Sequence, residues 1–439
     1  MDPTNVFVHR GYPEHTYIER ENQTKGERSF EDQLYTDLRK NYHVKISGPT
    51  KSGKTQLVIR VAKNKLNEDA FMKIKGSNID SKGDLSSEAV DLLSLPDEST
   101  VKAGKEETKS LRAKIAARLG LADTEISGEL TRTEIQELEK VTDNTSKSLS
   151  NLLQSVESEN LVVLIDNFHY IDEKVRKEIS QTIRDLETNF CIAMIPHRMD
   201  DIYLSNQDLG GRIKSIKIEY WKEEELKSIA REGFNILNMN FTDDTVSRLA
   251  KESVGSPQLM QQMCQSLCVD VFKMEDSADE GEKFSTSEED IERIAQEVVD
   301  TTEADKIFNR LKSGKNPRGQ ERVGFPVENG IADGYTLILR AIGKDPIFKE
   351  RVFDIDELER RVNEEIKGDT NRRKQDILKD CGKMEEIAKD GFPNDLTIEW
   401  DEQEEKLAIS NPNLFFYLRW VDRDKLTDER SDMKRVKGE

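Results

Sequence analysis

The stretch GPTKSGKT at residues 48–55 constrains the fold of this chain more than any other feature. It matches the pattern Gly-x-x-x-x-Gly-Lys-Ser/Thr, in which glycines let successive backbone N–H groups curl around a phosphate and the lysine reaches the outer phosphates. Such a loop needs a strand before it and a helix after it. Val44–Ile46 has the composition of a short strand, and residues 56–63 can continue as a helix with one apolar face. The sequence therefore predicts a phosphate-binding loop.

The residues of this loop have separate expected roles. Lys54 would bind the outer phosphates, Thr55 would place its hydroxyl on Mg²⁺, and the helix that begins near Lys54 would point its positive end at the anion. The nucleotide-binding residues that we expect here are Gly48, Pro49, Thr50, Lys51, Ser52, Gly53, Lys54, Thr55 and Gln56. The ligands that we expect are ATP and Mg²⁺.

A second motif with a matching role lies at residues 161–166. Leu161–Ile165 is a continuous apolar run, as expected for a parallel strand that is covered on both faces. Asp166 follows at its carboxyl end, where ligands bind in open α/β sheets. A buried strand that ends in a turn aspartate would give the same pattern. Together with the loop upstream, the motif predicts that Asp166 helps to hold Mg²⁺.

The residue after Asp166 bears on hydrolysis. Many ATPases of this type carry a glutamate there to polarise the attacking water. This chain has Asn167, which can orient a water molecule but cannot accept its proton. His169, Asp172 or Glu173 could substitute, and the sequence does not choose between them. We therefore expect slow hydrolysis, with the nucleotide acting more as a switch than as a fuel.

Composition excludes several other classes of protein. Apolar and charged residues each make up 35% of the chain, and the formal net charge is −20. Such a charge disfavours non-specific binding to nucleic acid or to an anionic membrane. Cys264 and Cys268 have no further Cys or His pair nearby, so we expect core thiols rather than a zinc site. No apolar signal region or membrane-spanning run is present, so we expect a cytoplasmic protein that does not bind a membrane.

The pattern along the chain predicts several parts. These are a lead-in at 1–43, an α/β core at 44–220 with a charged insertion at about 66–155, a helical region at 221–300, a C-terminal domain at 301–420 and a polar tail at 421–439. Within the helical region, Thr242 is a plausible N-cap. The C-terminal domain has three helical stretches followed by a hairpin at 396–410, which is the layout of a winged helix. We expect the apolar stretch 411–420 to pack as its closing element.

The charge of the C-terminal domain indicates whether its partner is DNA or protein. Residues 311–439 contain 25 Lys/Arg and 29 Asp/Glu, unlike the basic surface of a dedicated DNA-binding protein. The predicted hairpin is also acidic at its tip. One exception is the basic stretch 310–322, which could contact a nucleic-acid backbone, contact an acidic protein or simply be solvated. A winged helix that binds protein is our leading interpretation.

Taken together, these motifs resemble those of prokaryotic STAND proteins (signal-transduction ATPases with numerous domains) and of the related Orc1/Cdc6-like AAA+ ATPases. The resemblance implies that Arg20, in YIERE, belongs to the box before the loop, and that Arg198, in IPHR, senses the γ-phosphate. GSP at 255–257 resembles the Gly-x-Pro of the helical lid, whose proline, here Pro257, packs near the adenine. Gly255 and Pro257 could equally be a C-cap and a first-turn proline, and both can hold. Asn167 departs from the acidic residue that is usual in the family.

The predicted fold is therefore an α/β P-loop NTPase core of AAA+/STAND type with a parallel sheet, a helical lid and a C-terminal winged helix. The catalytic residues that we expect are Lys54, Asp166, Asn167 and Arg198. The leading function is a slow ATPase switch that controls a protein partner or its own assembly, for example in signalling or defence. The rival is a DNA-dependent AAA+ ATPase of the origin-binding or transposition-helper type. A third option is a module that holds ATP without hydrolysing it.

Overall fold

The computed structural model of the chain contains two compact units. The residues that it describes are 1–21, 28–66, 71–81, 83–85, 88, 161–184, 188–195, 211–279, 282–301, 304–315, 322–344, 351–392, 397–428 and 434–435. The sheet unit comprises Glu19–Pro49 and Gly53–Glu219. The helical unit comprises Met1–Ile18, Thr50–Ser52 and Tyr220–Glu439.

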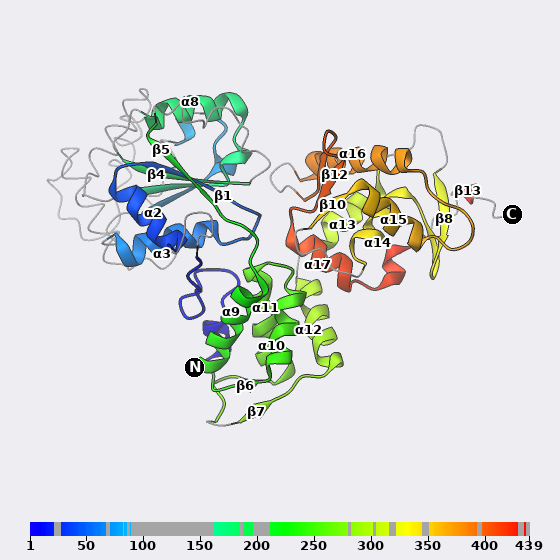
Figure 1. Cartoon of the computed structure of the whole chain (residues 1–439), viewed down its shortest axis with the longest axis horizontal. Coiled ribbons are helices and arrows are strands. Elements are labelled where there is room, and N and C mark those ends of the chain that lie inside the picture. The colour runs from blue at the N-terminus through cyan, green and yellow to red at the C-terminus, as the bar shows by residue number, and fades with distance from the viewer. Residues whose placement is uncertain are drawn as a thin grey trace, which may run out of the picture. The chain divides into compact units, whose positions relative to one another are not determined.

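Five parallel strands form the centre of the sheet unit (Figure 1). They are β1 (His43–Ser47), β2 (Phe71–Lys75), β3 (Val162–Asp166), β4 (Asn189–Met194) and β5 (Ile213–Lys217). Their order across the sheet is β2-β3-β4-β1-β5, and all four pairings are parallel. The strand that precedes the loop and the strand that ends in Asp166 therefore lie on either side of β4.

Helices cover both faces of this sheet. They are α2 (Phe30–Arg39), α3 (Lys54–Lys65) and α8 (Glu173–Arg184), and Figure 1 shows α8 across the sheet from α2 and α3. Every residue of β1 and β3 is buried. In β3 the side chains are apolar up to Asp166, as expected for a strand covered on both faces. In β1 the buried side chains include the polar residues His43, Lys45 and Ser47. The predicted strands at 44–46 and 161–165 and the helix after the loop are confirmed.

Strand β2 was not predicted from the sequence, and it lies inside the range of the predicted charged insertion. Met72 and Ile74 are buried, whereas the lysines of this strand are partly or fully exposed. It pairs with β3 from Phe71 opposite Val162 to Lys75 opposite Asp166. β2 is therefore the strand at one edge of the sheet. Most of the remaining predicted insertion lies outside the described residues.

The first half of the helical unit is a group of packed helices. Its main elements are α9 (Glu223–Ile236), α10 (Asp243–Glu252), α11 (Pro257–Ser266), a π-helical turn at Leu267–Val271, and α12 (Glu288–Thr301). Its short elements are α1 (Pro3–Val6), β6 (Asn240–Phe241) and β7 (Lys283–Phe284). Thr242 caps α10 through its side chain, as predicted. Cys264 and Cys268 are buried core thiols, also as predicted.

The N-terminal segment packs against these helices. The ring of Phe7 lies 5.2 Å from that of Phe234, and Phe7 is fully buried. A Cβ atom at Gly233 would lie 2.2 Å from the Phe7 ring, so this close approach depends on glycine. The first 18 residues thus belong to the helical unit, whereas the sequence grouped them with the lead-in to the first strand.

The second half of the helical unit contains the three helices and the hairpin that the sequence predicted. Its elements are α13 (Ala304–Ser313), β8 (Val323–Val327), β9 (Gly330–Ala332), α14 (Gly334–Ile342), β10 (Val352–Asp354), α15 (Ile355–Glu365), α16 (Lys374–Gly391), β11 (Glu399–Asp401), β12 (Lys406–Ala408), α17 (Pro412–Trp420), the 3₁₀ turn Arg423–Leu426, and β13 (Lys434–Arg435). The hairpin β11–β12 also pairs with β10, in the order β10-β12-β11. The strand β10 was not predicted.

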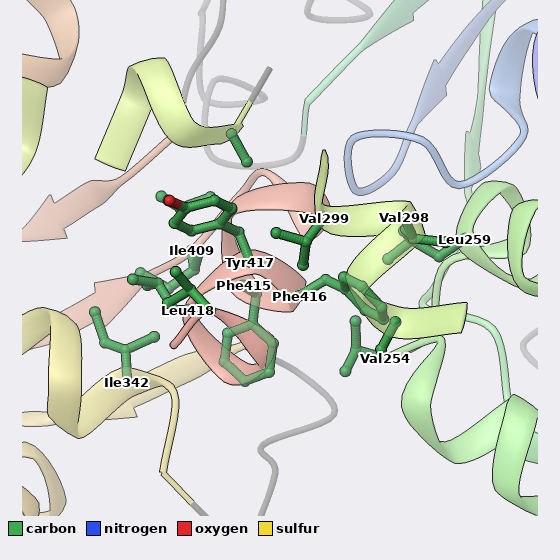
Figure 2. Close-up of a cluster of buried hydrophobic side chains, with 14 of the residues drawn as sticks. Val254, Leu259, Val298, Val299, Ile342, Ile409, Phe415, Phe416, Tyr417 and Leu418 are labelled. Atoms are coloured by element: carbon green, nitrogen blue, oxygen red, sulfur yellow. The ribbon is translucent and has the colours of Figure 1, made fainter. Parts of the chain in front are cut away.

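Helix α17 is the predicted closing element, and it is buried. Figure 2 shows Phe415, Phe416 and Leu418 of α17 beside side chains from several other helices of the unit. Phe416 lies beside Val254, while Ile342 of α14 lies on the other side of α17. The stretch 411–420 is therefore apolar because it fills a core, and it is not an exposed binding motif.

The length and polarity of the helices bear on whether they could cross a membrane. Among the residues that the structure describes, no helix combines the length and the apolar character needed to cross a lipid bilayer.

Candidate functional site

The phosphate-binding loop follows β1 directly and ends at α3. Gly53 is the N-cap of α3 and has φ +94°, a left-handed conformation that glycine adopts without strain. No side chain caps this helix, and its first turn contains no acidic residue. The first backbone N–H groups of α3 are therefore available to an anion, and the helix dipole favours negative charge there.

Lys54 lies in the first turn of α3 with its ammonium group folded back on the loop. Its Nζ donates hydrogen bonds to the carbonyl oxygens of Gly48, at 2.9 Å, and Pro49, at 2.7 Å. The side chain is buried, and burial lowers the pKa of Lys54 from 10.5 to about 8, with the negative charge of Asp166 opposing that shift. The ammonium is shielded from water, and its hydrogen-bond partners among the described residues are neutral carbonyl oxygens. A phosphate would supply the missing negative charge.

Thr55 and Asp166 meet although 111 positions separate them in the chain. The Thr55 hydroxyl donates to Oδ2 of Asp166 at 2.9 Å. Hydroxyl and carboxylate oxygens are the hard ligands that Mg²⁺ prefers, usually completed by water and substrate phosphates. No cluster of three or more His, Cys, Asp or Glu that could hold a metal occurs among the described residues. The pair therefore fits Mg²⁺ that arrives with a nucleotide better than it fits a metal cage made of protein alone.

A third side chain, which the sequence analysis missed, reaches the same carboxylate. Lys73 of β2 places its Nζ 2.9 Å from Oδ2 of Asp166, the oxygen that also accepts from Thr55. No motif could have revealed it, because β2 was not recognised and the contact depends on its register with β3. The side chain of Lys73 is 37% exposed and that of Asp166 is 11% exposed. A cation from the protein therefore already neutralises the predicted metal ligand.

Asn167 begins the turn that follows β3. It has φ 59° and ψ 44°, a left-handed conformation in which asparagine is enriched among residues other than glycine. The three residues that could replace a catalytic glutamate lie in different surroundings. His169 is buried with its ring against Tyr170, at 4.2 Å between centroids, and Oδ1 of Asp172 accepts from the backbone N–H of Lys174, at 2.9 Å. Asp172 thus acts as a local cap at the start of α8, and Glu173 is exposed on the first turn of that helix.

Arg20 is buried within the sheet unit. Its Nη1 donates to the carbonyl of Glu219 at 3.2 Å, and its guanidinium lies 5.6 Å from the centre of the Phe30 ring. These contacts join the segment before α2 to the segment after β5. Arg20 therefore has a structural role in these contacts, and the nucleotide role that the resemblance implied stays a prediction.

Of the predicted residues Pro257 and Arg198, the structure describes only the first. Pro257 is the first residue of α11, after an N-cap at Ser256 and a left-handed Gly255 with φ +73°. This geometry matches the helix-joining alternative that the sequence left open. The adenine contact of Pro257 stays a prediction. Arg198 lies outside the described residues, so its role as a sensor also stays a prediction.

The strand order, the loop after β1 and the carboxylate at the end of β3 define the class of this molecule. Its core has the α/β P-loop NTPase fold, with a five-stranded parallel sheet. Parallel strands bring both motifs to one edge of the sheet, where ligands of such folds bind.

Comparisons with known proteins give structural similarity only. No protein-family model matches the chain, and no curated protein matches its sequence. One similar solved structure is the Walker-type ATPase PABY2304 of Pyrococcus abyssi, at 14% identity over 92% of this chain and 99% of that chain, with a TM-score of 0.49. Another is the Orc2 protein of Aeropyrum pernix in ADPNP-ADP complexes, at 12% identity over 93% and 95% of the two chains, with a TM-score of 0.43.

A third similar structure is the Orc1 protein of Aeropyrum pernix in complex with DNA. It has 9% identity over 97% of each chain and a TM-score of 0.39. At these identities and scores, the roles of individual residues rest on the geometry of this chain alone.

Proposed function

We propose that the chain binds ATP with Mg²⁺, hydrolyses it slowly and uses the bound nucleotide as a conformational switch. The observation that carries this proposal is the convergence of Lys54, Thr55 and Asp166 at one edge of the parallel sheet. Each has the chemistry that its position in the motif requires. The buried ammonium of Lys54 in particular is hydrogen-bonded, among the described residues, to neutral carbonyl oxygens, and a phosphate would supply an anionic partner in their place.

The residues of the chain would share the work as follows. Lys54 exchanges its two carbonyl partners for phosphate oxygens, and the N–H groups at the start of α3 bind the same anion. Thr55 and Asp166 would hold Mg²⁺, which neutralises charge on the phosphates. Gly53 lets the backbone approach closely. These steps account for binding without assigning any proton transfer.

Slow turnover follows from the position after Asp166. Asn167 can accept a hydrogen bond from water but cannot take its proton. His169 is buried beside Tyr170, and Asp172 caps α8. These positions argue against an efficient general base among the described residues at the carboxyl ends of the strands. ATP would therefore persist long enough to act as a signal, and this supports a switch.

The partner that we propose is a protein or a second copy of this chain, in the cytoplasm. The C-terminal elements have the layout of a winged helix, but their charges do not suit DNA. The hairpin tip at 401–404 is exposed and acidic. Arg322, from the basic stretch, donates to Asp333 at 2.7 Å, and Lys315 forms an ion pair with Glu386. Basic side chains that the unit itself neutralises have less charge to offer a phosphate backbone.

The winged-helix layout nevertheless supports one rival function, a DNA-dependent ATPase. Both are tested by measuring ATP binding and turnover of the purified protein, with and without double-stranded DNA. We expect slow turnover that DNA does not change. Stimulation of turnover by DNA of several-fold would overturn the charge argument and favour the rival.

The control for this experiment is a matched pair of lysine variants. Lys54→Ala should weaken ATP binding by about a thousandfold, or about 4 kcal/mol, because it removes a buried charge from the phosphates. Lys40→Ala removes an exposed lysine of the same unit and should leave binding unchanged. If Lys54→Ala binds ATP as tightly as the wild-type protein, the proposed function is wrong.

A further inference from the structure

Lys73 lies at the middle of β2, and the sheet fixes its position. It is in register with Leu164 of β3, two residues before Asp166. Beyond it, the chain passes so close to the Asp166–Asn167 turn that a Cβ atom at Gly76 would lie 2.4 Å from the carbonyl oxygen of Asn167. The end of β2 is therefore held tightly against the end of β3. The backbone of Lys73 is therefore held in place relative to Asp166, and its ammonium contacts the Asp166 carboxylate from there.

The contact is specific to one atom. Oδ2 of Asp166 lies 2.9 Å from Nζ of Lys73 and 2.9 Å from the Thr55 hydroxyl oxygen. The function proposed above assigns this same hydroxyl and carboxylate to Mg²⁺. A divalent ion held there would stand beside an ammonium group of like charge. At such separations like charges repel measurably, even where solvent screens them.

We propose that Lys73 is a positioning residue that holds Asp166 while the site contains no metal, and that it competes with Mg²⁺ for this carboxylate. The inference rests on the proposed function, because it assumes that Mg²⁺ binds with the nucleotide. Lys73 orders Asp166 and, through it, Thr55 before Mg²⁺ binds, and it must release Oδ2 when Mg²⁺ binds. The competition raises the Mg²⁺ concentration at which the site fills.

The strand supplies its own control. Lys75 is two residues further along β2, carries the same charge and is opposite Asp166 in the backbone register. Its side chain is exposed, whereas that of Lys73 is partly buried beside the carboxylate. Replacing either lysine by methionine removes one positive charge and keeps a similar length. Only the Lys73 change removes the contact with Oδ2.

The test measures how Mg²⁺ promotes binding of a fluorescent ATP analogue, followed by anisotropy, with free Mg²⁺ set by a chelator. In Lys73→Met, the half-saturating Mg²⁺ concentration should fall by about three- to tenfold, the equivalent of the like charge removed. Lys75→Met should stay within about twofold of the wild-type protein, the range expected for an exposed charge. Lys73→Arg keeps a positive charge at this position and should keep the wild-type value. An unchanged or higher half-saturating concentration in Lys73→Met overturns the proposal, as does an equal fall in Lys75→Met.

A second measurement separates this proposal from the proposed function. Thermal unfolding is followed without nucleotide or Mg²⁺ for Lys73→Met, Asp166→Asn and the double variant. The effects should be non-additive, because either change alone already breaks the pair. Additive effects would mean that the two side chains do not interact, and the proposal would fail even if ATP binds. Failure of the wild-type protein to bind ATP at all would instead refute the function, whatever the coupling.

Discussion

The sheet unit and the helical unit both bury charged side chains, but they give those charges different partners. In the helical unit, Arg340 is almost completely buried and its Nε donates to Glu365 at 2.8 Å, while Nη1 donates to the carbonyl of Leu426 at 3.0 Å. Arg361 is likewise buried and donates to Glu357 at 2.6 Å. In the sheet unit, the hydrogen-bond partners of the Lys54 ammonium among the described residues are two carbonyl oxygens.

The difference distinguishes charges that build the fold from charges that serve a ligand. An arginine with a carboxylate partner is satisfied by its own chain, and removing that partner leaves an uncompensated charge. A lysine with only neutral partners stays charged at a cost, which is why the pKa of Lys54 is lowered. Arg351 is intermediate, because it is buried against the ring of Tyr220, at 4.6 Å, and burial lowers its pKa as well. Burial of a charged side chain therefore does not by itself indicate a ligand site. The presence or absence of a carboxylate partner distinguishes the two kinds of buried charge.

The strongest test of this distinction in the helical unit breaks the pair of Arg340 and Glu365. Glu365→Leu should lower the free energy of unfolding of that unit by about 3 kcal/mol, because Arg340 is left buried without a countercharge. ATP affinity should not change, since the pair contributes only to folding. Calorimetric unfolding and an ATP titration of the same variant would measure both effects.

A neighbouring residue provides the control for that experiment. Glu364 precedes Glu365 on α15 and forms a more exposed ion pair with Lys344, so Glu364→Leu should cost less than about 1 kcal/mol. The double variant Arg340→Met with Glu365→Leu should recover most of the loss, because no charge is left unpaired. If Glu364→Leu and Glu365→Leu lower the free energy of unfolding equally, burial of the Arg340–Glu365 pair does not increase its contribution to stability.

A smaller effect is expected from His43, a buried base of the sheet unit that has no ligand role. Burial lowers the pKa of His43 from 6.5 to about 4, and the nearby charge of Arg212 adds to the shift. Between these values the unfolded chain binds a proton that the folded chain does not. Stability is therefore lost as the pH falls, by about 2.5 kcal/mol between pH 7.5 and 4.5.

Comparison of variants isolates this contribution from that of other groups. Unfolding of the wild-type protein and of His43→Leu would be measured across that pH range, with His15→Gln as a control at an exposed histidine. The stability of His43→Leu should depend less on pH than that of the wild type, and His15→Gln should follow the wild type. If His43→Leu loses stability with acid just as steeply, the histidine is not held neutral by its surroundings.

The smallest expected effect concerns Asn167, whose position depends on the backbone rather than on charge. Asn167→Ala should destabilise the sheet unit by about 1 kcal/mol, because alanine is strained in a left-handed conformation. Asn167→Gly should be tolerated better, since glycine adopts that conformation freely. Calorimetry on the two variants checks the order. A glycine variant less stable than the alanine variant would show that the asparagine side chain contributes more than its backbone.

The sequence predicted the parts of the site that local patterns encode. The loop at 48–55 has a strict pattern, and the strand before Asp166 is a continuous apolar run, so both elements were found. The sheet order was not predictable, because pairing between distant strands leaves no local pattern. β2 was missed since FMKIK contains two lysines within a charged region, and its edge position needs only one buried face. Lys73 was missed with it.

The pairing of β2 with β3 also bears on how the molecule forms and how it can change. These strands are neighbours although residues 76–161 lie between them in the chain. The entropy of closing such a long connection grows only with the logarithm of its length, so doubling the connection costs about 0.6 kcal/mol. During synthesis, the contact between Lys73 and Asp166 can form only after residue 166 has been made. Over evolutionary time, the connection can become longer or shorter without changing that contact.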